Sequence, residues 1–219
     1  MKNKYNPFIQ TLLDSLPQRI LILDGAMGTM VQQYKLNEED FRGSLFQESK
    51  VNLKGNNDVL VLTQPHIIKE IHSKYLGAGA DIIETCSFNS NRISQSDYGL
   101  ESYTYKLNYE AARVAKEAAN EWTSRTPDKP RYVAGSIGPT NQTASISSDV
   151  ANPGYRKFYF DDFVTAYREQ ALGLIDGGVN LLLVETIFDT LNCKAAIFAI
   201  NQVLKEKNLS IPIMLSVTI

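Results

Sequence analysis

Three carboxylates in the sequence stand where apolar runs end, so that their side chains can reach a shared site. Asp24 and Glu185 each follow a strongly apolar run directly, and Glu84 lies near the end of another. The formal net charge of the chain is only −2, so three acids placed in this way are a local concentration of negative charge. They predict an acidic mouth that suits a small cationic group, such as the α-amino group of an amino acid.

A hydroxyl and three glycines accompany these acids. Ser136 ends a further apolar run, and Gly25, Gly28 and Gly138 follow the ends of such runs. Glycine lets a ligand approach the backbone closely, and we expect the N–H groups of these three to be free to bind a carboxylate. The two sets of groups together predict a pocket that binds both ends of an amino acid.

The same acids could instead have a purely structural role, and at Glu84 this alternative stays open. A single Asp or Glu after a strand often caps the following helix or forms a structural salt bridge. For Glu84 this interpretation and a role in the site are equally supported. For Asp24 and Glu185 the site is favoured, because no intervening polar residue separates either acid from its apolar run.

The histidines and cysteines favour packing over chemistry. His66 and His72 are six residues apart on a predicted helix, so they do not share a face as a pair of ligands would. Cys86 and Cys193 are the only cysteines, far apart and without the paired Cys element common in zinc sites. They indicate neither a zinc site nor a disulfide scaffold, and they fit a reducing cytosol.

The elements that position these groups alternate between strand and helix. Runs that are apolar almost throughout, with polar residues only at their ends, predict buried strands. The stretches between them have apolar residues at helical spacing and predict helices. The predicted strands are 20–23, 81–85, 132–137, 180–184 and 211–218; the predicted helices are 65–76, 103–122, 161–175 and 190–205. This alternation predicts an α/β fold, and the lack of a G-x-G-x-x-G or Walker A loop weighs against a nucleotide-binding open sheet. We expect a (β/α)8 TIM barrel truncated after about the fifth strand.

Two long segments interrupt this alternation after strand ends. They span residues 30–64 and 141–160, and we expect both on the face that carries the site. The predicted organisation is a lead-in helix at 1–18 followed by the N-terminal portion of the barrel at 19–219.

Composition narrows the location and the partners. No apolar run is long enough to span a bilayer, and residues 1–16 contain no signal-peptide pattern. There is no basic excess of the kind that nucleic-acid binding needs. We expect a cytoplasmic protein that binds neither membrane nor nucleic acid.

Several motifs resemble the homocysteine methyltransferase barrel family, in the same order and spacing. They are ILILDGAMGTMVQ (20–32), NLKGNNDVLVLTQP (52–65), GAGADIIETCSFNSN (77–91), AGSIGPTN (134–141) and LLLVETIFDTLN (181–192). The second motif resembles the cobalamin-dependent methionine synthase branch more than the branches that use betaine or S-methylmethionine.

The resemblance implies methyl transfer to the thiol of homocysteine, giving methionine. It implies a zinc ion whose three cysteine ligands fall beyond Ile219, and cobalamin and methyltetrahydrofolate bound on other domains of the parent protein. It assigns contacts with homocysteine to Asp24, Gly25, Glu185 and the backbone of Ala26. Further positions that match the family's strand-end motifs are Glu84, Asn89, Ser136 and Gly138.

Three alternatives remain beside this prediction. The parent protein could be a cobalamin-independent homocysteine S-methyltransferase that uses another methyl donor. The chain could be a non-catalytic module that binds an amino acid. An unrelated barrel enzyme, such as an aldolase, ranks last because no lysine stands near a predicted strand end to form a Schiff base. For this chain by itself, we expect no catalytic activity.

Overall fold

The computed structural model describes residues 5–147 and 149–218, so residues 1–4 of the predicted lead-in segment and Ile219 lie outside it. Within this part of the chain, four strands form one parallel sheet in chain order: β1 (Ile82–Glu84), β2 (Tyr132–Ile137), β3 (Leu181–Ile187) and β4 (Ile213–Val217). The predicted α/β fold with a parallel sheet is thereby confirmed.

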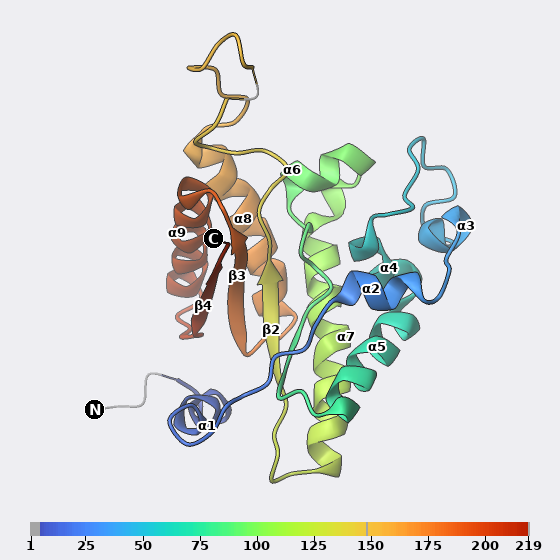
Figure 1. Cartoon of the computed structure of the whole chain (residues 1–219), viewed down its shortest axis with the longest axis vertical. Helices are drawn as coiled ribbons and strands as arrows, with labels where there is room; N and C mark the ends of the chain where they lie inside the picture. The colour runs from blue at the N-terminus through green and yellow to red at the C-terminus, as the bar shows by residue number, and fades with distance from the viewer. Residues whose placement is uncertain (1–4, 148, 219) are drawn as a thin grey trace.

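Four long helices alternate with the strands, as the apolar spacing predicts. They are α5 (Pro65–Ala78), α7 (Thr104–Arg125), α8 (Phe160–Asp176) and α9 (Thr190–Glu206), and Figure 1 shows them packed beside the sheet. Pro65 begins α5, where a missing N–H costs nothing, and Gly79 ends it with a left-handed φ of 116°. Asp189 caps α9 by accepting from the N–H groups of Leu191 and Asn192.

Alternate strand residues pack into two separate hydrophobic clusters. Val133, Ile137 and Leu182 face the core shared with α7, α8 and α9. Tyr132 and Leu183 face the opposite side, where α1 (Pro7–Ser15) contributes Leu12. All of β2 and the first four residues of β3 are therefore buried, which explains why these central strands are apolar almost throughout.

The first predicted strand, 20–23, is wrong in part. Only an isolated parallel bridge joins Leu23 to Ile82, and Ile22 accepts hydrogen bonds from the N–H groups of Asp81 and Ile82. The side chain of Ile20 is 83% exposed. At the other edge, Leu215 and Val217 of β4 are also exposed. The expectation of burial on both faces fails at these edges, because each edge strand has a neighbour on one side only.

The two long segments fold differently from one another. The insertion, residues 30–64, begins within α2 (Met27–Gln32) and includes α3 (Glu38–Arg42), η1 (Asn57–Val59) and α4 (Leu60–Thr63). The described residues of the arm, 141–159, form no helix or strand, and the arm projects beyond the C-terminal end of β2 (Figure 1).

The base of the arm is closed by hydrogen bonds. Asp189 accepts from the N–H and the Oγ of Ser145 at 2.9 and 2.6 Å. Arg156 donates to the carbonyl oxygens of Ala144 and Ser145 at 2.9 and 2.7 Å. The arm therefore leaves and re-enters the body of the molecule at one point.

Three connecting elements complete the described chain: α6 (Arg92–Gln95), η2 (Ser96–Tyr98) and η3 (Glu101–Tyr103). No helix in the described residues is both long and apolar enough to cross a membrane.

Candidate functional site

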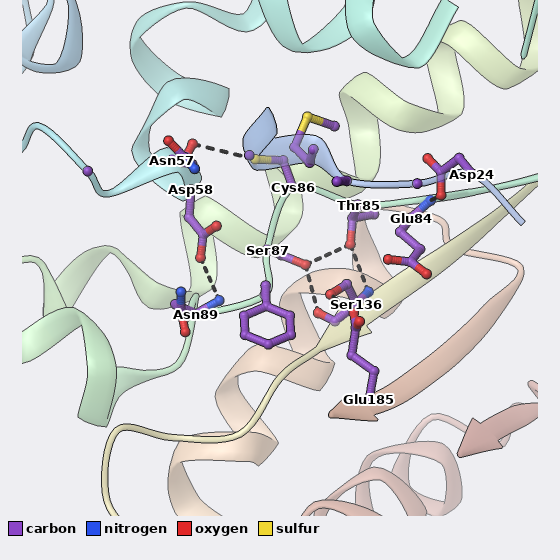
Figure 2. A pocket seen from close by; sticks show the side chains of 16 residues that line it. Asp24, Asn57, Asp58, Glu84, Thr85, Cys86, Ser87, Asn89, Ser136 and Glu185 are labelled. Atoms are coloured by element: carbon purple, nitrogen blue, oxygen red, sulfur yellow. Dashed lines mark hydrogen bonds between the residues drawn. The ribbon is translucent and has the colours of Figure 1, made fainter. Parts of the chain in front are cut away.

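A cavity of about 460 Å³ opens beside the ends of β1 and β2 and the start of α2. It is lined by every predicted site residue except Gly138. Those residues are Asp24, Gly25, Ala26, Glu84, Asn89, Ser136 and Glu185. Figure 2 shows Asp24, Glu84 and Glu185 together at one side of the cavity. The structure thus brings together three acids that lie far apart in the sequence, at positions 24, 84 and 185.

Asp24 is fixed by the backbone of the neighbouring strand. Its Oδ1 accepts from the N–H of Glu84 at 3.0 Å, and its own N–H donates to the carbonyl oxygen of Ile82 at 2.9 Å. The short parallel bridge at Leu23 therefore sets the position of this carboxylate even though no full strand forms. The hydrogen bond also ties Asp24 to the strand that carries the second acid.

Glu185 stands at an irregularity of β3. The pairing with β4 shifts register between Val184 and Ile187, and Thr186 has a left-handed φ of 54°. A bulge of this kind redirects the side chains beside it and occurs often next to functional sites. Ser136 Oγ donates to the Glu185 carboxylate at 2.5 Å, so two strand ends are joined across the cavity.

Burial and mutual repulsion control the ionisation of these acids. Burial raises the pKa of Asp24 to about 8, and the negative charges of Glu84 and Glu185 add to the rise. Burial together with the charge of Glu185 raises the pKa of Glu84 to about 7. The pKa of Glu185 is also raised by burial, against the opposing hydrogen bond from Ser136.

This arrangement is suited to a cation. No Lys, Arg or His is among the described residues that line the cavity, so the acids lack a basic partner within it. A bound ammonium group would relieve the repulsion that raises their pKa values and would favour the ionised forms. The sequence-based expectation of an acidic mouth therefore agrees with the geometry.

The opposite wall contains residues that the sequence did not reveal. Asp58 Oδ2 accepts from the N–H of Asn89 at 2.7 Å and from the Oγ of Ser90 at 3.0 Å. Burial raises the pKa of Asp58 to about 6. Asn57 and Cys86 lie beside it in Figure 2, and the Cys86 thiol donates to the Asn57 carbonyl oxygen at 3.4 Å. The wall is built by the insertion together with the loop 86–90, and the apolar run of the insertion gave no sign that Asp58 faces a cavity.

Gly138 is used differently from the expectation. It lies outside the lining of the cavity, and its N–H donates to the carbonyl oxygen of Phe88 at 3.0 Å. The prediction that this amide is free for a ligand is therefore wrong. A Cβ at Gly138 would stand 2.6 Å from the same oxygen, so glycine is required here for the strand end to approach the 86–90 loop.

The remaining histidine and cysteine predictions concern packing and metals. His72 is fully buried on α5, as a helix-packing side chain would be. Cys86 is buried at the cavity wall, and Cys193 is partly buried on α9. Within the described part of the chain, no three His, Cys, Asp or Glu side chains are placed to hold a metal ion. The described residues therefore do not fit a zinc site by themselves.

Comparison with known proteins decides the family. The model of the homocysteine S-methyltransferase family matches residues 21–219. The chain belongs to this family.

Solved structures of one bacterial protein resemble the fold. Crystal structures of the homocysteine methyltransferase MmuM from Escherichia coli match with a TM-score of 0.65 and 25% identity for the metallated form. The oxidized form gives 0.65 and 24%, and the apo form gives 0.64 and 23%. The alignments cover 92%, 93% and 97% of this chain but only 63%, 63% and 64% of MmuM. The chain thus spans less than two thirds of the length of these relatives.

Proposed function

We propose that this chain binds homocysteine for an enzyme that methylates the homocysteine thiol and forms methionine. One observation carries the proposal: in a member of this family, Asp24, Glu84 and Glu185 meet in one cavity without a basic partner among its described lining. The α-ammonium group of the substrate would stand among these carboxylates. Its carboxylate would accept from the backbone N–H groups of Gly25 and Ala26.

Ser136 has a positioning role in this proposal. Its hydroxyl donates to Glu185, so it holds that carboxylate toward the cavity and keeps one of its oxygens from turning away. The hydrogen bond also favours the ionised form of Glu185, which is the form that attracts an ammonium group. Asp24 and Glu84, whose pKa values are raised to about 8 and about 7, would ionise when the substrate binds.

We further propose the cobalamin-dependent branch of the family, with methylcobalamin as the methyl donor and methyltetrahydrofolate as its source. The support is the motif at 52–65, which forms η1, α4 and the wall that contains Asp58. A zinc ion, which would lower the pKa of the homocysteine thiol, would be held by residues outside this sequence. The folate and cobalamin domains of the parent protein would be the partners of this chain.

We also propose that the sheet is an open part of a (β/α)8 barrel. All its strands are parallel and follow chain order, each linked to the next by at least one helix. Apolar side chains are exposed at both edges, at Ile22 and at Leu215. Closure against further strands would cover both.

Calorimetric titration of the full-length protein tests the binding proposal. The ligands are L-homocysteine and 4-mercaptobutanoate, which lacks only the α-amino group. We expect Asp24→Asn and Glu185→Gln each to weaken homocysteine binding by about 10- to 100-fold, because each removes a charged partner of a desolvated ammonium group. The control is Glu206→Gln, which changes an exposed ion pair with Arg168. Neither site variant should weaken binding of the desamino ligand.

Unchanged homocysteine affinity in both site variants would remove the assignment of the acidic mouth. The methyl donor is tested separately, by turnover of the full-length protein with methylcobalamin or with S-methylmethionine. Turnover with S-methylmethionine alone would place the protein in a cobalamin-independent branch and leave the homocysteine pocket in place.

The zinc proposal is tested by the metal content of dialysed protein. We expect zinc in the full-length protein and none in residues 1–219 expressed alone, because the described residues include no set of three suitable ligands. Stoichiometric zinc in the shorter chain would contradict this expectation.

A further inference from the structure

A second cavity, of about 430 Å³, lies within the insertion and adjoins the acidic one. Gly55 and Asn57 line both cavities, so the two spaces meet at this point of the chain. The second cavity has an apolar floor and a cationic rim. The floor is formed by Val31, Leu36 and Phe41, and the rim by Lys35 and Lys54.

The insertion is folded in a way that holds this rim in place. Glu38 accepts from the backbone N–H groups of Leu53 and Lys54, at 2.9 and 2.8 Å. Arg42 pairs with the Glu38 carboxylate at 2.6 Å and donates to the carbonyl oxygens of the chain that leads to Lys54. Glu38 is thus already neutralised by Arg42 and by backbone N–H groups, so its charge does not cancel that of the lysines.

The charges of the two lysines are available to a ligand. Both side chains are exposed, and neither pairs with a carboxylate among the described residues. The floor beneath them is part of a hydrophobic cluster, in which Val31 and Phe41 are 3% and 4% exposed. There is free space beside Gly55, because a Cβ there would meet no atom within 4 Å.

We propose that this cavity binds an amphiphilic organic anion, with an apolar body on the floor and a carboxylate or phosphate between Lys35 and Lys54. The two adjoining cavities then differ in charge, and each selects the opposite charge on its ligand. The anion site does not depend on what the acidic cavity binds. Its placement beside homocysteine does rest on the proposed function.

Lysine footprinting tests the site without any need for activity. The full-length protein is acetylated briefly with and without 2-naphthoate, 2-naphthyl phosphate or the neutral 2-naphthamide, and the modification of each lysine is read by mass spectrometry. We expect the two anions, but not the amide, to protect Lys35 and Lys54. Lys106, an exposed lysine on α7, is the internal control and should not be protected. The anion that protects the two lysines more strongly indicates whether the site prefers a carboxylate or a phosphate.

Affinity measurements by equilibrium dialysis complete the test. Lys35→Gln and Lys54→Gln should each weaken anion binding by about fivefold, the effect of one partly exposed charge, whereas Lys106→Gln should not. Asp24→Asn should leave anion binding unchanged, which separates this site from the homocysteine pocket. Equal labelling with and without the anions, protection of only one rim lysine, or equal protection by the amide would overturn the proposal.

Discussion

Asp24, Glu84 and Glu185 share one small volume at the acidic mouth, and the charge of Glu185 raises the pKa of both other acids. The effect is largest at Asp24, whose pKa of about 8 reflects burial and then the charges of Glu84 and Glu185. A carboxyl group in this situation holds its proton at neutral pH and releases it when a cation arrives. Ligand binding and proton release are therefore coupled at this site.

The coupling predicts how affinity depends on pH. Homocysteine should bind more tightly as the pH rises from about 6 to about 8, because fewer protons must then leave Asp24 and Glu84 on binding. Titration calorimetry in buffers of different ionisation enthalpy would measure the protons released. The Asp24→Asn variant should release fewer. An affinity that falls over this interval would contradict the proposed contact with the ammonium group.

The same acids affect stability in the absence of ligand. Folding raises the pKa of Asp24 from 3.8 to about 8, so its favourable contribution is complete below the unfolded value and is lost as the pH rises through the folded value. Asp24→Asn keeps the acceptor for the Glu84 N–H and should stabilise the ligand-free protein at about pH 8 by about 2 kcal/mol, and far less at about pH 4. Thermal melts at the two pH values would measure the difference, with Glu206→Gln as the control. A destabilised Asp24→Asn variant at the higher pH would contradict the cause assigned to the shift.

The sequence predicts these acids because each one ends an apolar run, and strand ends of a parallel sheet meet at one edge. Asp58 escapes the same reasoning, since it opens an apolar run that forms η1 and α4 instead of a strand. Gly138 is predicted to serve a ligand, but glycine is needed there because a side chain would collide with the backbone of Phe88. The spacing of residues in the sequence does not reveal site residues such as Asp58, because tertiary contacts of the insertion bring them to the cavity.

Among the elements, helices are predicted closely and the first strand is not. Periodicity gives 65–76 and 190–205, and the structure has Pro65–Ala78 and Thr190–Glu206, because proline, glycine and a capping aspartate mark the ends. The run at 20–23 is as apolar as the others but forms only a bridge to Ile82. The bulge of β3 at Thr186 also has no sequence signal, because it depends on pairing with β4.

Helix α5 contains a buried histidine whose two ring nitrogens have no hydrogen-bond partner among the residues that the structure describes. Burial lowers the pKa of His72 from 6.5 to about 4, so folding keeps the ring neutral. Stability should therefore fall as the pH drops from about 6.5 to about 4, where the unfolded chain binds a proton that the folded chain does not.

His72→Leu should remove this part of the acid sensitivity, which is on the order of 2 kcal/mol. Thermal melts across this pH interval would measure it, and His66→Leu, on the same helix but not fully buried, is the matched control. Equal loss of stability in acid for His72→Leu and the parent protein would show that another group is responsible.

At the scale of the whole molecule, the sheet has two unpaired edges that are rich in apolar side chains. Ile20 and Ile22 are exposed at one edge, and Leu215 and Val217 at the other. An unpaired apolar edge is a template for association with another strand. Among the described residues, no helix or strand covers these apolar side chains.

We expect residues 1–219 expressed alone to self-associate or aggregate. Light scattering after size exclusion would measure this, and Leu215→Lys combined with Ile22→Lys should reduce it by placing charges at both edges. A sharp, reversible melt of a monomer of the unaltered chain would contradict the expectation.

The arm has a consequence for how the polypeptide can be divided. Hydrogen bonds made by Ser145, Asp189 and Arg156 close its base, while Val150 at its tip is exposed to solvent. A protease that cuts at the tip would break the covalent chain but not the packing of α8 against α7 and α9. The two pieces, expressed from separate genes, should therefore find one another and reassemble, which would make the tip a point for building a split reporter of folding.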